Sequence, residues 1–128
     1  MISGTGIDIV EIDRIRESIE KNERFKSLVF SAEEIEYCEK QGAAYQSYAA
    51  RFAAKEALFK ALGTGWRGKL AFSEVSVEND QWGKPIIRLS GDTLKTVEAL
   101  GSTNIHLSIS HARAYATAVV IIEKLSQG

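Results

Sequence analysis

The sequence predicts an α+β fold in which antiparallel strands pack on one long central helix. Residues 44–62 have helical periodicity with a broad alanine-rich stripe, which is typical of a helix that packs on more than one side. Residues 72–89 and 105–122 each contain two alternating segments joined by a short turn, which favours antiparallel pairs of strands. The 128 residues, 45% hydrophobic and 26% charged, predict one globular domain over residues 1–128.

Composition and charge narrow the class of protein. A formal net charge of −1 argues against general nucleic-acid binding. The single cysteine, Cys38, excludes an internal disulfide and a cysteine-rich zinc site, which fits a reducing cytosol. Residues 1–6 lack the basic start of a signal peptide, and Asp8 and Glu11 interrupt any apolar segment. We therefore expect a cytoplasmic protein that neither binds nucleic acid nor enters a membrane.

The central helix, residues 44–62, has distinct sides. Phe52 and Phe59 lie next to one another on the helical wheel, while Arg51 with Lys55 and Glu56 with Lys60 form two polar edges. Small side chains let a sheet approach the helix closely, so the alanine stripe predicts contact with strands. The stripe consists of Ala50, Ala53, Ala54, Ala57, Leu58 and Ala61.

Glu56 is the first chemical candidate, because a carboxylate beside aromatic rings is costly to desolvate unless a cation or several donors meet it. It is either half of an ordinary surface pair with Lys60 or a metal-binding or catalytic carboxylate. Gly63, Thr64 and Gly65 follow the helix and would free backbone N–H groups for an anion. The same three residues are also a usual way to end a helix, and that interpretation is favoured without further observations.

The N-terminal segment, residues 2–10, predicts a strand with Ile7 and Ile9 on one face and Gly6, Asp8 and Val10 on the other. Aspartate is disfavoured in strands, so Asp8 lies either at an open edge or where its carboxylate has a function. Glycines at positions 4 and 6 permit close approach of another backbone or of a ligand.

Basic residues recur through the predicted helix at residues 11–21 and just beyond it. Its charges alternate with acidic residues, which favours a solvated helix face. The alternative is a docking surface for an acidic partner with one apolar anchor, Phe25. The candidate docking residues are Arg14, Lys21, Arg24, Phe25 and Lys26.

The remaining elements follow from local signals. Ser31 and Glu34 form a capping box that starts a short helix ending near Gly42. Strands are predicted at 72–78 and 86–89 around the turn at 79–85, a helix at 91–101 capped near Ser90 or Asp92, and strands at 105–110 and 115–122. His111, at the last turn, either binds a ligand phosphate, transfers a proton, or satisfies backbone groups.

Three separated blocks with their order and spacing make the sequence resemble the holo-acyl-carrier-protein synthases, the small bacterial type of 4′-phosphopantetheinyl transferase. The blocks are residues 6–12 (GIDIVEI), residues 51–65 (RFAAKEALFKALGTG), and residues 108–111 (SISH) with 115–116 (YA). Residues 30–38 and 83–85 are similar to the family as well, so the resemblance covers nearly the whole chain.

The resemblance implies the fold of this family and the transfer of 4′-phosphopantetheine from coenzyme A to a serine of apo acyl carrier protein, which serves fatty acid biosynthesis. It implies that Asp8 and Glu56 are catalytic and bind Mg²⁺, an ion that would neutralise the diphosphate being cleaved. Lys60 would face the phosphates and help the leaving group. The other implied cofactor contacts are Arg51, Lys55, Gly63, Thr64, Gly65, Gly83, Lys84, Pro85 and His111. The base for the serine hydroxyl stays open between Glu56 and a water on the metal.

Two other classes of function remain as alternatives. A Mg²⁺-dependent phosphohydrolase would use the same carboxylates with water as the nucleophile, and a non-catalytic regulator would use only the basic face of residues 14–26. Residues 114–122 (AYATAVVII) are apolar on both faces of the predicted strand, which predicts packing against copies of the chain. The resemblance implies a homotrimer with active sites between subunits; the alternative is a monomer whose own helices cover both faces of the sheet.

Overall fold

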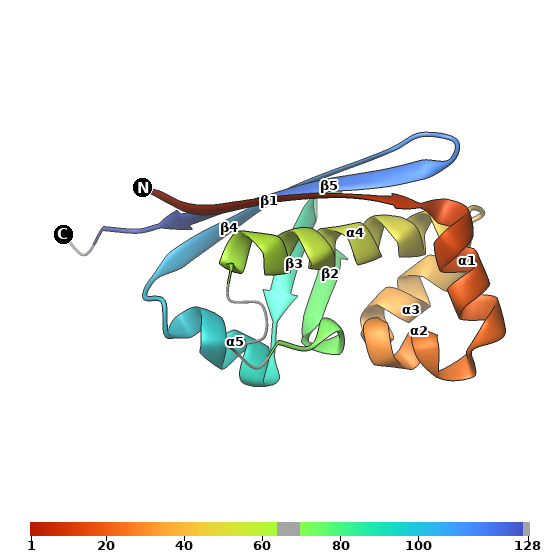
Figure 1. The fold of residues 1–128 in the computed structure, drawn as a ribbon, viewed down its shortest axis with the longest axis horizontal. Coiled ribbons are helices and arrows are strands. Elements are labelled where there is room, and N and C mark those ends of the chain that lie inside the picture. The colour runs from red at the N-terminus through yellow and green to blue at the C-terminus, as the bar shows by residue number, and fades with distance from the viewer. Residues whose placement is uncertain (64–69, 127–128) are drawn as a thin grey trace.

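A three-stranded antiparallel sheet packs on the long helix α4 (Ala44–Leu62). In the computed structural model, which describes residues 1–63 and 70–126, strand β5 (Tyr115–Lys124) is central, with β1 (Ile2–Glu11) and β4 (Thr103–His111) on either side. Figure 1 shows the sheet extended along the helix axis. The predicted α+β class, with an antiparallel sheet on a long central helix, is confirmed.

Strand β5 divides its side chains between two environments. Ala116, Ala118, Val120 and Ile122 are buried on the side that contacts α4, where they meet Leu58 in the main hydrophobic core. Thr117, Val119 and Ile121 alternate with them on the other face and are only partly buried. On the same outer face, Ile7 and Ile9 of β1 remain 63% and 65% exposed. The single chain therefore covers one face of its sheet and leaves an apolar strip on the other.

Helix and sheet approach each other through glycine and alanine. A Cβ atom added to Gly6 would lie 1.9 Å from the carbonyl oxygen of Ala57, and one added to Gly4 would lie 2.0 Å from that of Ala61. Both distances are far below any real contact, so the two backbones touch only because these strand positions have no side chain. The close approach predicted from the glycines and the alanine stripe is therefore present.

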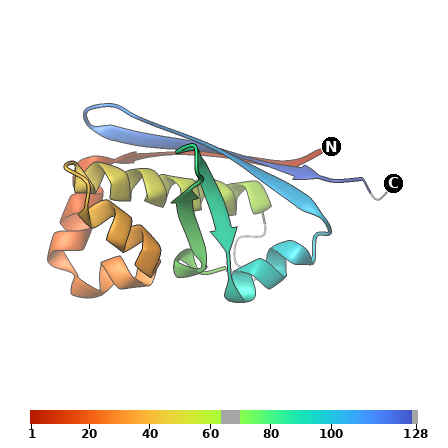
Figure 2. The same ribbon diagram turned by 180° about the vertical axis from the view of Figure 1, so that it is seen from behind.

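The other elements surround α4. Helices α1 (Ile12–Lys21), α2 (Glu23–Val29) and α3 (Ala32–Glu39) gather at one end of it, and the hairpin of β2 (Val75–Asn79) and β3 (Pro85–Leu89) crosses it away from the sheet. Figure 2 shows this hairpin from behind, with α5 (Gly91–Glu98) below it. Across residues 1–63 and 70–126, no helix combines the length and apolar character needed to span a membrane.

Three local predictions need correction. Residues 72–74, expected to begin a strand, form a 3-10 helix, η1, and residues 23–29 form a separate helix that the sequence analysis did not delimit. Helix α5 has no cap from the side chain of Ser90. Instead the carboxylate of Glu74 accepts the N–H groups of Asp92 (3.2 Å) and Thr93 (3.0 Å). These outcomes depend on tertiary contacts that a local pattern does not contain.

Substitution of Gly6 by alanine should destabilise the protein strongly, because the new methyl group would overlap the Ala57 carbonyl unless α4 moves away from β1. We expect a loss of about 3 kcal/mol or more in the free energy of unfolding, measured by urea denaturation. Gly42→Ala is the matched control, since nothing lies within 4 Å of its new Cβ. Equal stability of the two variants would contradict the close packing of β1 on α4.

Candidate active site

Close packing of β1 on α4 brings together three of the predicted catalytic residues. Asp8 lies on the helix-facing side of β1, and its side chain is 15% exposed. The Lys60 ammonium, on the last turn of α4, donates to Asp8 Oδ1 at 2.9 Å and to the Ile7 carbonyl at 3.0 Å. The sequence analysis offered Glu56 as the partner of Lys60, one helical turn away. The structure instead pairs Lys60 with Asp8 from the neighbouring strand.

Glu56 lies beside this pair, and its surroundings raise its pKa. Burial is the largest cause that raises the pKa of Glu56; the negative charge of Asp8 raises it further, and Lys60 partly opposes both. Asp8, Glu56 and Lys60 line a cavity of about 370 Å³ together with apolar side chains that include Phe25 and Phe52. Two carboxylates and one amine thus meet at the edge of an apolar hollow.

The donor set of this cavity fits Mg²⁺. In residues 1–63 and 70–126, no cluster of three or more acidic, histidine or cysteine side chains could hold a metal by itself. Mg²⁺ is commonly bound through one or two carboxylates, with substrate phosphates and water completing its coordination. Repulsion between Asp8 and Glu56, visible in the raised pKa of Glu56, is what a shared cation would relieve. Asp8 and Glu56 are therefore the residues that would hold the ion.

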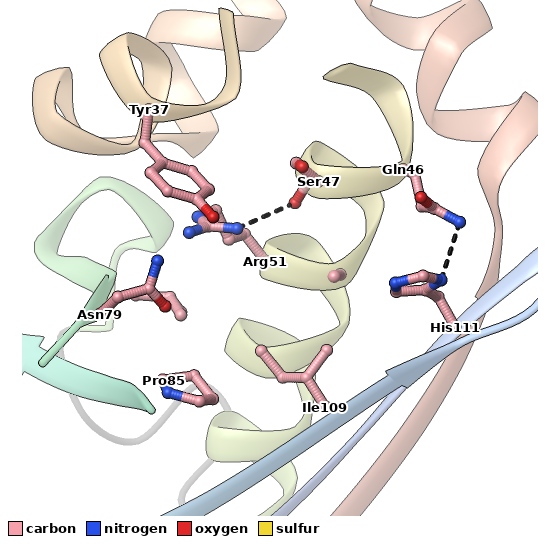
Figure 3. Close-up of a pocket in the computed structure, with 10 residues that line it drawn as sticks. Tyr37, Gln46, Ser47, Arg51, Asn79, Pro85, Ile109 and His111 are labelled. Atoms are coloured by element: carbon pink, nitrogen blue, oxygen red, sulfur yellow. Dashed lines mark hydrogen bonds between the residues drawn. The ribbon is translucent and has the colours of Figure 1, made fainter. Parts of the chain in front are cut away.

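A second cavity, of about 190 Å³, lies between α3, α4, the β2–β3 hairpin and β4 (Figure 3). Arg51 of α4 is only 6% exposed there, and its guanidinium lies over the Tyr37 ring, 4.3 Å from the ring centroid. The structure gives Arg51 no carboxylate within the described part of the chain, and its buried Nε has no hydrogen-bond partner. Among the described residues the guanidinium makes one hydrogen bond, from Nη1 to the Ser47 carbonyl, and it is long at 3.5 Å. A buried cation with so few partners marks a site for an anion.

Residues from the sheet and the hairpin complete this Arg51 cavity. His111, at the end of β4, lines it, and the His111 Nδ1 lies 2.8 Å from Nε2 of Gln46. Pro85 and Asn79 line it from the hairpin. Gly83 and Lys84 lie in the adjoining turn, where Gly83 has a φ of +82° that favours glycine. Of the implied cofactor contacts, His111 and Pro85 thus share one cavity with Arg51.

Lys55, expected to contact the cofactor, is fully buried instead. Its ammonium donates to Glu34 Oε1 at 2.6 Å, to the carbonyls of Val29 (2.8 Å) and Phe72 (2.9 Å), and to that of Val75. Burial is the largest cause that lowers the pKa of Lys55, and Glu34 opposes it. We therefore correct the prediction: Lys55 joins α3, β2 and η1 to α4 and offers no group to a ligand. Arg51 and Lys55 do not form an exposed polar edge.

Two further groups have structural roles. Gly63 ends α4 in the left-handed conformation (φ +65°) with its N–H donating to the Phe59 carbonyl, so the helix-stop interpretation holds at this residue. Thr64 and Gly65 lie outside the described residues. Burial raises the pKa of the Cys38 thiol to about 12, so this cysteine is not a nucleophile at neutral pH.

The predicted docking residues fall into two groups. Arg14, Lys21 and Phe25 line a groove of about 400 Å³ on α1 and α2, which shares Arg14, Ser18 and Phe25 with the carboxylate cavity. Arg24 is exposed on the first turn of α2. Lys26 is engaged within the chain, because its ammonium bonds Glu39 at 3.3 Å and lies over the Tyr48 ring. Four of the five residues therefore remain available at this surface.

Sequence reasoning missed Tyr37, Gln46 and Asn79 as site residues. Each lines the Arg51 cavity, but none has a charge or a motif that separates it from ordinary surface residues. It also missed Glu34 as the partner of Lys55, although the capping box had singled out Glu34. That carboxylate accepts the Ser31 N–H as the capping box requires, and it also accepts the Val77 N–H at 2.9 Å.

Comparison with known proteins defines the class to which this fold and site belong. The family model described as the 4′-phosphopantetheinyl transferase superfamily matches residues 4–120. The chain therefore belongs to the 4′-phosphopantetheinyl transferase superfamily, as its sequence motifs implied.

Individual relatives narrow the class further. The chain is 52% identical to the holo-[acyl-carrier-protein] synthase of Ruminiclostridium cellulolyticum over 91% of this chain and 89% of that one. A Bacillus anthracis holo-(acyl-carrier-protein) synthase in complex with CoA (3′,5′-ADP) superposes with a TM-score of 0.79 at 36% identity, covering 98% and 99% of the two chains. The holo-[acyl-carrier-protein] synthase of Neisseria meningitidis superposes with a TM-score of 0.88 at 35% identity, covering 97% of this chain and 100% of that one. Within the superfamily the chain is thus a phosphopantetheinyl transferase of the holo-acyl-carrier-protein synthase type.

Replacing Glu56 by glutamine should stabilise the isolated protein at pH 7. A raised pKa in the folded state means that ionised Glu56 destabilises the fold above the unfolded pKa of about 4.3, and that this cost disappears at lower pH. We expect Glu56→Gln to raise the melting temperature at pH 7 and to leave it unchanged at pH 4, both measured without divalent ions. The control Glu36→Gln removes an exposed partner of Lys40 and should give no increase at either pH. A lower melting temperature for Glu56→Gln at pH 7 would contradict the raised pKa.

Proposed function

We propose that this enzyme transfers 4′-phosphopantetheine from coenzyme A to a serine of apo acyl carrier protein, with Mg²⁺, and releases adenosine 3′,5′-bisphosphate. The observation that carries the proposal is that the chain has two sites whose charges it does not fully compensate. In one, the carboxylates of Asp8 and Glu56 lie beside Lys60; in the other, Arg51 is buried without an anion among the described residues. Coenzyme A offers a diphosphate to the first and a separate 3′-phosphate to the second. Activation of the carrier would serve fatty acid biosynthesis in the cytoplasm. The free thiol of Cys38 is compatible with that reducing compartment.

At the carboxylate cavity, the serine oxygen would form a bond to the β-phosphorus while the bond from that phosphorus to the bridging oxygen breaks. The leaving phosphate stays on adenosine. The Lys60 ammonium lies in this cavity, where it would stabilise the negative charge that develops on that phosphate. The serine proton goes to the carboxylate of Glu56, which lines the same cavity, or to solvent. Bound by Asp8 and Glu56, Mg²⁺ would supply charge neutralisation at the diphosphate.

At the Arg51 cavity, the 3′-phosphate would bind Arg51 and His111, and the adenosine would lie along the hairpin at Gly83, Lys84 and Pro85. A planar guanidinium held against the Tyr37 ring has its position fixed before the ligand arrives, which lowers the entropic cost of binding. The structure of the Bacillus anthracis relative with CoA (3′,5′-ADP), which covers nearly the whole of both chains, supports this class of ligand.

One incubation tests the reaction. Coenzyme A, Mg²⁺ and an apo carrier should yield a carrier heavier by the phosphopantetheine group, detected by mass spectrometry, and Asp8→Asn should reduce the rate at least about 100-fold. Chelation of divalent ions should have a similar effect. Hydrolysed coenzyme A with an unmodified carrier would favour the phosphohydrolase instead, and no reaction at all would favour a non-catalytic regulator.

We further propose that the carrier docks on the groove of α1 and α2. The groove joins the carboxylate cavity directly, so a serine presented from it would reach Glu56 without crossing another element. Arg14, Lys21 and Arg24 supply positive charge for an acidic carrier, and Phe25 supplies a half-buried apolar contact.

Charge reversal on this surface should affect KM for the carrier and not KM for coenzyme A. Arg14→Glu combined with Arg24→Glu should raise KM for the carrier at least about tenfold and leave KM for coenzyme A nearly unchanged, with the effect shrinking at high salt. Lys40→Glu is the control, because Lys40 follows directly after α3 and forms an exposed ion pair with Glu36. An unchanged KM for the carrier would place the docking surface elsewhere.

The two cavities also support an active site shared between subunits. Their linings have no residue in common, and Arg51 and Glu56, five residues apart on α4, project about 140° from one another. We propose that one coenzyme A joins the carboxylate cavity of one chain to the Arg51 cavity of the next in a homotrimer. The exposed apolar strip of Ile7 and Ile9, beside Val119 and Ile121 of β5, would form the interface.

Assembly can be tested at the outer face of the sheet. Ile7→Glu should convert the trimer into monomers by light scattering at micromolar concentration and abolish transfer, while leaving the far-UV circular dichroism unchanged. Leu28→Glu is matched in exposure, 64% against 63%, but lies on α2 away from the sheet, and it should leave the mass unchanged. A wild-type mass of one chain, with full activity on dilution, would refute the shared site.

A further inference from the structure

We propose that Gln46 is a positioning residue that selects the neutral tautomer of His111 whose Nε2–H is directed into the Arg51 cavity. The inference rests on the proposed function, because it concerns how this cavity receives the 3′-phosphate. It starts from the 2.8 Å contact between Gln46 Nε2 and His111 Nδ1, two side chains that both line the cavity. Figure 3 shows that the other ring nitrogen of His111 points away from Gln46, toward the side where Arg51 lies.

The orientation of the Gln46 amide decides the tautomer of the neutral His111 ring. With its NH₂ group toward the ring, as the structure has it, Gln46 donates to Nδ1, so a neutral imidazole carries its proton on Nε2. When the ring is protonated, both of its nitrogens carry protons and Nε2 is a donor without help from Gln46, so the amide matters for the neutral ring. In both states the nitrogen that faces the cavity is a donor.

A donor of fixed direction suits a phosphate, whose oxygens only accept hydrogen bonds. The opposite neutral tautomer would turn a lone pair of Nε2 toward those oxygens and repel them. Arg51, buried with an unpartnered Nε, is the fixed charge of the cavity, and His111 adds a neutral, directional donor to it. Gln46 and Arg51 both belong to α4, so one rigid helix holds the charge and the group that orients the imidazole.

The second histidine of the chain provides a natural contrast. His106 Nε2 lies 3.1 Å from the carboxylate of Glu123 on the outer face of the sheet. A carboxylate can only accept a hydrogen bond, so it selects a proton on the nitrogen in contact with it, and in a neutral ring the other nitrogen then has a lone pair. The NH₂ group of Gln46 selects the opposite arrangement, in which the nitrogen in contact accepts and the cavity-facing nitrogen of His111 carries the proton.

Nitrogen NMR of the two histidine rings tests the tautomer directly. At pH 8.5, where a free imidazole is neutral, the wild-type protein should show His111 with its proton on Nε2. Gln46→Met, of similar length but without donor or acceptor, should show a mixture of both tautomers. Gln46→Glu should move the proton to Nδ1, because a carboxylate must accept there. The His106 signals should be unchanged in both variants, which also confirms that they fold.

Ligand binding tests the consequence. At pH 8.5, Gln46→Met should weaken binding of adenosine 3′,5′-bisphosphate about 3- to 10-fold, the usual effect of losing one oriented hydrogen bond. Binding of adenosine 5′-phosphate, which lacks the 3′-phosphate, should change less than twofold. The same tautomer of His111 in wild type and both variants, or equal losses for the two nucleotides, would overturn the role of Gln46. Wild-type protein that holds the Nε2–H tautomer but binds neither nucleotide would instead refute the proposed function.

Discussion

The contact of β1 with α4 is the constraint on which the carboxylate cavity depends. Because Gly4 and Gly6 have no side chains, the strand backbone rests on the carbonyls of Ala57 and Ala61. At that separation Asp8, the next inward residue of β1, comes within hydrogen-bond distance of Lys60. Side chains at positions 4 and 6 would hold the strand away from the helix and separate these groups. The small residues are therefore as necessary to this cavity as the charged ones.

The buried pair of Lys55 and Glu34 has the corresponding role on the other side of α4. Its hydrogen bonds reach the carbonyls of Val29 and Phe72 and the N–H of Val77, which belong to three different parts of the chain. Loss of either partner would leave a charge without compensation in the core, a change that typically costs about 3–5 kcal/mol. By joining α3 and β2 to the helix, this pair holds two walls of the Arg51 cavity in place, since Tyr37 and Asn79 come from those elements or their ends.

Helix α4 thus presents different chemistry in different directions. Lys55 faces inward and is fully compensated within the chain, whereas Arg51 and Glu56 are only partly compensated and line separate cavities. Charged side chains without a partner in the chain destabilise the fold. Such residues are found at functional sites, where a ligand supplies the opposite charge. This difference in compensation separates the structural charges of the helix from the functional ones.

Much of this architecture follows from the sequence by itself. Residues 44–62 form the predicted helix at its predicted limits, the strand pairs are antiparallel, and the motifs around Asp8 and Glu56 identify the family. Periodicity and capping are local properties, so a linear sequence contains them. Only the tertiary structure decided that Lys60 meets Asp8, that Lys55 is buried with Glu34, and that Gln46 contacts His111. The residues of these three pairs are 52, 21 and 65 positions apart in the sequence. A charged or polar side chain has several possible partners in the sequence, and the packing of the elements decides which one it contacts.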